Sequence, residues 1–321
     1  MVQPKLQTQE LHSGRPPWHT VLVLSFIVLL SVVFLPSFSD LDHTVAVPET
    51  FSRRLFPQYL SLEWLIILRA ASAAFILGMS VYNVKIAFSD NPVAVLVPYL
   101  KQSQLQKGKP IFLRGFFCQA PFTLWAWNLL GLSFALNAYL SHAVLTNRTI
   151  SPVWLRMGVF LFEMAAPLAL MVSAVVKYAI WPQALKAGSG TSVLKTFRAL
   201  CYHNLNVILA VAEVVLWGGL PVRLMDVSLA ALFGSGYVLF AWSIAHLWNP
   251  AAGPQYLYFF LDVTLGTTTT LILLILYVVF IIFYTIFCGL HQLVDHVGVD
   301  NLPAHVMSLV LVSALVCRIR D

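Results

Sequence analysis

The chain has 321 residues, of which 59% are apolar and only 10% are charged. A soluble globular domain carries about 25% charged residues, so this composition excludes an ordinary soluble protein and indicates a membrane protein. The net charge of +6 does not indicate nucleic-acid binding, because the Lys and Arg residues lie between apolar runs, as topology signals do.

The first apolar run covers residues 18–36 and is long enough for a signal peptide or a bilayer span. No small-residue cleavage site of the A-x-A kind follows it. We therefore predict an uncleaved signal-anchor helix at 18–36, preceded by a cytoplasmic tail at residues 1–17.

Further apolar runs follow at residues 62–88, 120–141, 154–179, 202–220, 228–248 and 256–290. A span needs about 18 or more apolar residues. The shorter apolar segment at 303–317 suits a short span or an interfacial helix. These runs predict an all-α fold, a polytopic transmembrane helical bundle. It has six core spans within 60–290, the extra N-terminal anchor helix, and a C-terminal extension at 291–321 with a short apolar segment.

The distribution of Lys and Arg predicts the orientation of the bundle. If the N-terminus is cytoplasmic, the cytoplasmic segments hold Lys5, Arg15, Lys101, Lys107, Lys109, Arg114, Lys186, Lys195 and Arg198. The opposite segments hold Arg53, Arg54, Arg148, Arg156 and Arg223. The excess of Lys and Arg on the first of these two sides supports this orientation. It does not identify the kind of membrane.

Four side chains that could take part in catalysis lie at the predicted cytoplasmic face. Thr123 and His203 each begin a span, His246 ends one, and Asp262 lies near the start of the next. A threonine hydroxyl needs a base within about 2.6–3.2 Å to act as a nucleophile, and a histidine can be that base. The start of a helix also offers backbone N–H groups that can stabilise an oxyanion.

Each of these residues also has a structural explanation. Thr123 follows Pro121 by two residues, where a threonine often only caps a helix. His203 and His246 lie near span ends, where interfacial histidines are common. These alternatives stay open at the level of single residues.

Other polar residues lie in the span 202–220. Asn204 or Asn206 could orient His203, since residues three apart share a helix face. Glu213 lies about 15 Å deeper than His203 at 1.5 Å per residue. An ionisable group inside a span costs about 2.5 kcal/mol or more and usually has a partner, so we expect Glu213 to pair with Arg69 or His246.

Several segments, taken in order, resemble the androgen-induced protein family, which includes the androgen-dependent TFPI-regulating protein. The likeness covers about residues 60–290. The segments that carry it are "FTLWAWNLL", "WLRMGVFLFEMAAPLALMVSAVVKYAIWPQ", "HNLNVILAVAE", "GYVLFAWSIAH" followed by "YLYFFLD", and "GTTTTLILLILY". His203 and Glu213 keep the family's ten-residue interval.

The resemblance implies six core spans and hydrolysis of fatty acid esters of hydroxy fatty acids. It also implies that Thr123 is the nucleophile and His203 the base. The chain departs from the family pattern at His246, which follows Ala245 where the family tends to have a second histidine. It departs again at Asn204 and Asn206, where the family has small or hydroxyl residues.

Two other classes of function fit the sequence. The polar groups could line the cavity of a non-enzymatic lipid-binding protein, carrier or sensor, or they could only bind helices together in a scaffold. No His or Cys pair has metal-ligand spacing and no P-loop lysine follows the glycines, so we expect no metal and no cofactor. The expected partners are bilayer lipid esters as substrates and no nucleic acid.

Overall fold

The computed structural model describes residues 15–89, 93–95, 97, 99–105, 110–186, 191–248, 253–298 and 301–321. Most of the predicted tail at 1–17, with Lys5, lies outside this part, as do Lys107 and Lys109. The chain is 73% helical. One antiparallel pair of short strands, β1 (Val93–Val95) and β2 (Ile111–Leu113), joins two parts of a loop. The all-α class is therefore confirmed.

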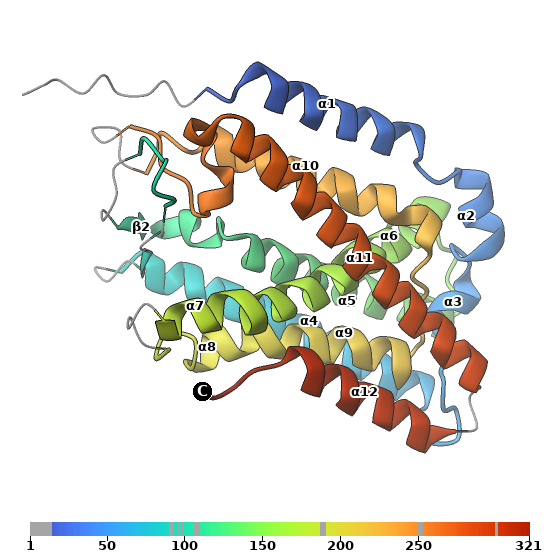
Figure 1. The fold of residues 1–321 in the computed structure, drawn as a ribbon. Helices are drawn as coiled ribbons and strands as arrows, with labels where there is room; N and C mark the ends of the chain where they lie inside the picture. The colour runs from blue at the N-terminus through green and yellow to red at the C-terminus, as the bar shows by residue number, and fades with distance from the viewer. Residues whose placement is uncertain are drawn as a thin grey trace, which may run out of the picture.

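Long helices form most of the molecule (Figure 1). They are α1 (Trp18–Val33), α4 (Leu62–Ala87), α5 (Phe122–Leu145), α6 (Pro152–Val175), α9 (Asn206–Val215), α10 (Val227–Ser243), α11 (Thr267–Val297) and α12 (Leu302–Val316). The short helices are α2 (Phe38–Thr44), α3 (Pro48–Ser52), α7 (Trp181–Lys186) and α8 (Phe197–Leu200). The described residues also form the 3₁₀ turns η1 (Gly115–Gln119), η4 (Leu224–Asp226), η6 (Phe259–Leu261) and η7 (Val263–Leu265), and the π-helical segments η2 (Val176–Ile180) and η3 (Cys201–Leu205).

Within the described part of the chain, five helices are long and apolar enough to cross a membrane. They cover residues 62–87, 122–145, 152–186, 224–243 and 267–297. Helices α1 and α2 make a sixth if the pair, bent by 54°, is one broken span. These helices indicate a multi-pass membrane protein. The predicted span 202–220 is not among them, because its amides, histidine and carboxylate lower its hydropathy.

The last predicted core span begins and ends later than expected. The sequence run starts at residue 256, but α11 begins at Thr267 because Gly266 before it adopts a positive φ of 60°. The residues ahead of Gly266 form a loop with two 3₁₀ turns. At the other end α11 continues past residue 290 to Val297, where Gly298 has a φ of 77°. The loop that replaces the start of this span reaches the candidate site.

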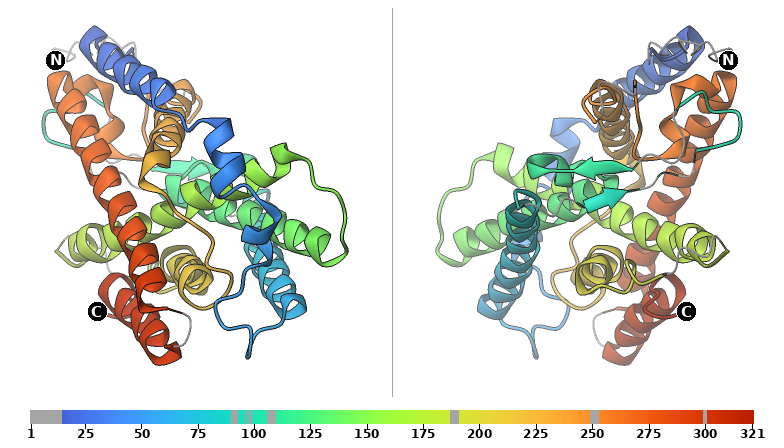
Figure 2. Two further views of the ribbon diagram at one scale, coloured as in Figure 1. Left: turned by 90° about the vertical axis from the view of Figure 1, so that its right-hand side faces the viewer. Right: turned by 90° about the vertical axis from the view of Figure 1, so that its left-hand side faces the viewer.

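Helix α6 lies at the centre of the bundle and packs against α5, α9, α10, α11 and α12. In its most apolar stretch 72% of the residues are buried, against 28% for α11. Figure 2 shows α4 and α11 on opposite sides, with α9 between them. The predicted anchor helix α1 lies along α10 and α11 (Figure 1), and its Thr20 hydroxyl bonds the Thr270 hydroxyl at 2.8 Å.

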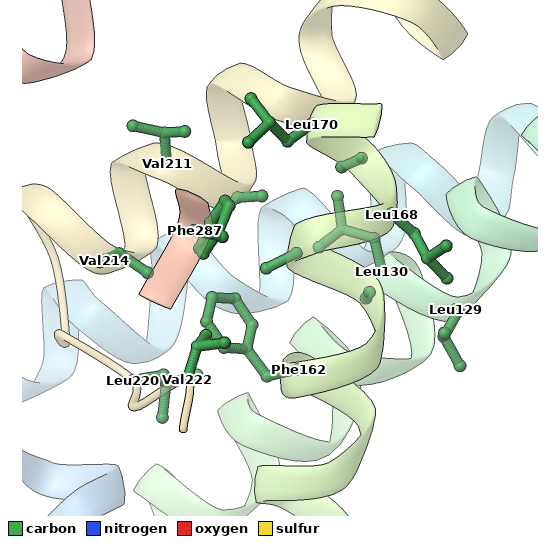
Figure 3. Close-up of a cluster of buried hydrophobic side chains, with 14 of the residues drawn as sticks. Leu129, Leu130, Phe162, Leu168, Leu170, Val211, Val214, Leu220, Val222 and Phe287 are labelled. Carbon is green, nitrogen blue, oxygen red and sulfur yellow. The ribbon is translucent and has the colours of Figure 1, made fainter. Parts of the chain in front are cut away.

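The main apolar core joins α5, α6, α9 and α11 (Figure 3). Leu130, Phe162, Val211 and Phe287 contribute one fully buried side chain from each of these helices. Burying such a side chain stabilises the fold by about 1.5–3 kcal/mol. This core packs α5, which carries Thr123, against the neighbouring helices.

Candidate functional site

Thr123 is the second residue of α5 and is half-buried. The N-cap of α5 is Pro121, whose own side chain makes no cap hydrogen bond. Thr123 therefore does not act as the helix cap, which removes the simplest structural explanation for a threonine at this position.

The loop before α11 brings a tyrosine to the start of α5. The Phe122 backbone N–H donates to the Tyr258 hydroxyl at 3.1 Å, directly before Thr123 in the chain. Burial raises the pKa of Tyr258 above its usual value, although this hydrogen bond opposes the shift. The phenol is thus protonated at neutral pH and can donate a hydrogen bond.

A partly open apolar cavity of about 110 Å³ lies beside this helix start, between α5, α6, α10, η6 and α11. Phe122 and Tyr237 both line it, and their rings meet edge to face at 4.8 Å between centroids. Phe260, two residues after Tyr258, lines it as well. Thr123 directly follows Phe122 in the first turn of α5, although Thr123 is not itself among the residues that line the cavity.

His203 lies in the π-helical segment η3 and is half-buried. Its neighbour Tyr202 packs edge-on against Trp127, one helical turn along α5 from Thr123, at 5.3 Å between ring centroids. The Nδ1 atom of His203 is buried and has no hydrogen-bond partner in the described structure. Among the same residues no hydrogen bond joins His203 to Thr123, so the predicted pair is not in direct contact.

The two asparagines after His203 have other partners. The Asn204 amide bonds the backbone of Arg318, accepting from its N–H at 3.0 Å and donating to its carbonyl at 2.9 Å. The Asn206 Oδ1 atom accepts from the Ser173 hydroxyl at 3.0 Å. Neither asparagine orients the His203 ring in this structure.

Glu213 pairs with Arg69, one of its two predicted partners. The Arg69 Nε donates to Glu213 Oε2 at 3.1 Å, and Arg69 Nη2 bonds the other carboxylate oxygen. The Arg69 Nη1 group donates to the Phe51 carbonyl at 3.0 Å and the Ser141 hydroxyl at 2.6 Å. Both charged side chains are fully buried, which makes Glu213 a structural residue.

Asp262 and His246 occupy the ends of the loop that carries Tyr258. The buried Asp262 Oδ1 accepts from the Thr264 N–H at 2.9 Å and the Thr264 hydroxyl at 2.7 Å. Its Oδ2 atom has no hydrogen-bond partner within the ranges described. His246 follows α10 and is exposed. Asp262 therefore shapes the loop, and neither residue contacts Thr123 through a described hydrogen bond.

Tyr258 is the site residue that sequence reasoning missed. It lies in "YLYFFLD", whose apolar and aromatic residues read as the beginning of a span. The density of aromatic residues was the available signal. Within the part of the chain that the structure covers, no group of three or more His, Cys, Asp or Glu side chains could hold a metal ion.

Comparisons with protein-family models, with curated proteins and with solved structures find no match to this chain.

Proposed function

We propose that the protein is a membrane-embedded hydrolase of lipid esters, with fatty acid esters of hydroxy fatty acids as its substrate class and Thr123 as its nucleophile. The observation that carries the proposal is the location of Thr123. Thr123 lies in the first turn of a long helix, is not its N-cap, and directly follows Phe122, which lines an apolar cavity of about 110 Å³.

The reaction requires two steps. The Thr123 Oγ1 atom attacks the ester carbonyl, and its proton passes to a base. The acyl group is then bonded to threonine, and the hydroxy fatty acid leaves after its alkoxide takes up a proton. A water molecule next attacks the acyl-threonine, which releases the fatty acid and restores the hydroxyl.

His203 is the proposed base. Its Nδ1 atom is buried and makes no described hydrogen bond, so it has an unused site for a proton. Transfer needs an approach of about 2.6–3.2 Å, or one intervening water. Because His203 does not contact Thr123 here, it must act through a water or after a movement of η3. Single-turn π segments such as η3 often occur at functional sites.

The test is ester hydrolysis by membranes that contain the wild-type chain, Thr123→Ala or His203→Ala at matched protein levels. The substrate is a branched fatty acid ester of a hydroxy fatty acid. We expect each variant to lose about 10³-fold or more of the turnover. Thr285→Ala is the matched control, because the Thr285 hydroxyl is exposed and bonds only its own helix at Ile281. Equal turnover in Thr123→Ala and wild type would contradict the assignment.

One observation favours an alternative function. The separation of Thr123 from His203 fits a non-enzymatic lipid-binding protein, carrier or sensor, in which the cavity holds a lipid without cleaving it. In that case wild-type membranes would show no turnover. They would bind a fluorescent fatty acid in a saturable way, and Thr123→Ala would weaken that binding only slightly.

A further inference from the structure

The loop between α10 and α11 is fixed to the bundle on both sides of Tyr258. Before it, the Tyr99 hydroxyl donates to the Tyr256 carbonyl at 2.8 Å and accepts from the Tyr256 N–H at 2.7 Å. After it, the Trp242 indole donates to the Leu261 carbonyl at 3.2 Å. Tyr258 is thus held by its neighbours in sequence and not only by its own side chain.

The Tyr258 ring has a defined orientation. It stacks on Phe260, with centroids 5.0 Å apart and planes 12° apart, and meets the edge of Tyr237 at 6.3 Å. Its oxygen accepts the Phe122 N–H. Tyr258 therefore holds the backbone of the first turn of α5, directly before Thr123.

A second tyrosine acts on the backbone behind Thr123. The Ala120 carbonyl, three residues before Thr123, accepts the Tyr237 hydroxyl at 3.1 Å. The two tyrosines therefore bind the backbone on both sides of Pro121, the N-cap of α5.

We infer that Tyr258 is a positioning residue for the reaction: its bond to the Phe122 N–H fixes the first turn of α5, which carries Thr123, and the bond of Tyr237 to the Ala120 carbonyl fixes the residues just before that turn. This inference rests on the proposed function. Holding a nucleophile in the attacking geometry changes the rate of the chemical step, whereas the acyl chain is bound by the cavity wall. Loss of the Tyr258 hydroxyl should therefore lower kcat and leave KM unchanged.

The experiment measures kcat and KM for the wild type, Tyr258→Phe and Tyr284→Phe in purified full-length protein. Tyr258→Phe keeps the ring and its stack on Phe260. We expect its kcat to fall about 100-fold at constant KM. Tyr284→Phe is the matched control, since it also removes a buried phenol bonded to a backbone carbonyl, that of Arg223, away from the cavity. It should keep wild-type kcat.

The outcomes separate the two proposals. If Thr123→Ala is inactive but Tyr258→Phe keeps wild-type kcat, or changes KM alone, the positioning role is overturned and the hydrolase proposal stands. If Thr123→Ala is as active as wild type, or the wild type has no turnover, both are overturned. Should Tyr258→Phe fail to fold, Tyr237→Phe decides: a fall in kcat at constant KM supports the inference, and an unchanged kcat overturns it.

Discussion

Arg69 on α4 and Glu213 on α9 form an ion pair in which neither side chain is exposed, although 144 residues separate them in the chain. The guanidinium also bonds the Phe51 carbonyl and the Ser141 hydroxyl, so the pair joins α3, α4, α5 and α9. A buried charge is tolerated when it is paired and hydrogen-bonded. This geometry meets both conditions and explains why a hydrophobic segment keeps a carboxylate.

Breaking this pair should destabilise the protein strongly. Glu213→Gln leaves Arg69 as an unpaired buried charge, which costs about 3–5 kcal/mol. We expect a large drop in melting temperature in detergent, measured by tryptophan fluorescence. The double variant Arg69→Met with Glu213→Leu removes both charges and should recover much of the loss. The assignment is wrong if Glu213→Gln melts and functions like the wild type.

Gly218 is predicted to be essential to the same pair. A Cβ atom at this position would overlap Arg69 Nη2 and lie 2.5 Å from Glu213 Oε1. Gly218→Ala should therefore displace the guanidinium and destabilise the protein by an amount comparable with loss of Glu213. Gly78→Ala is the control, because nothing lies within 4 Å of a Cβ there. Equal melting temperatures for the two variants would show that Arg69 can move aside at little cost.

The sequence predicts the helices well but not how they face each other. The long apolar runs become helices because helices satisfy their own backbone hydrogen bonds in lipid. Because a buried charge needs a partner, the sequence predicts that Glu213 pairs with Arg69 or His246, and Arg69 is the partner in the structure. Such arguments concern composition and length, which are local properties of the chain.

The candidate site was only partly predictable, for two physical reasons. The residues ahead of Gly266 are as apolar as a span, so the loop that delivers Tyr258 to α5 is hidden in the sequence. The π segment η3 inserts an additional residue into a turn. The rule that residues three apart share a helix face therefore fails for His203 and Asn206.

Filling the cavity should separate substrate binding from chemistry. Gly234 on α10 lines the cavity, and a Cβ atom added to it meets nothing within 4 Å. Gly234→Leu should occupy part of the space and raise KM for long acyl esters at least several-fold, with little change in kcat. Gly236→Leu is the matched control on the same helix, since Gly236 also has open space but does not line the cavity. A wild-type KM in Gly234→Leu, with the introduced side chain well ordered, would remove this cavity from the binding site.

The C-terminal segment, residues 317–321, lies across η3 and is predicted to be released by loss of a single carboxylate. Asp321 accepts from the Thr191 hydroxyl at 2.7 Å and the Trp181 indole at 3.1 Å, and it pairs with Lys195. These bonds, that of Lys195 first, lower the pKa of Asp321 to about 2 from its usual value near 3.8. A lowered pKa means that the stabilisation is present above pH 4 and is lost as the pH falls toward 2.

Cys317 reports this release at neutral pH. Burial raises the pKa of its thiol to about 11, so the thiolate is scarce while the segment is bound. Asp321→Asn mimics the protonated carboxyl and should free the segment, which lowers the thiol pKa toward 8.5 and increases the rate of alkylation at pH 8 several-fold. Asn204→Ala, which removes both bonds to Arg318, should do the same.

Cys317→Ser establishes which thiol reacts, since Cys118, Cys201 and Cys288 are buried. If alkylation of Cys317 is equally fast in wild type and both variants, the segment is not held by these bonds, and lowering the pH from 4 to 2 should then leave its cleavage by pepsin unchanged.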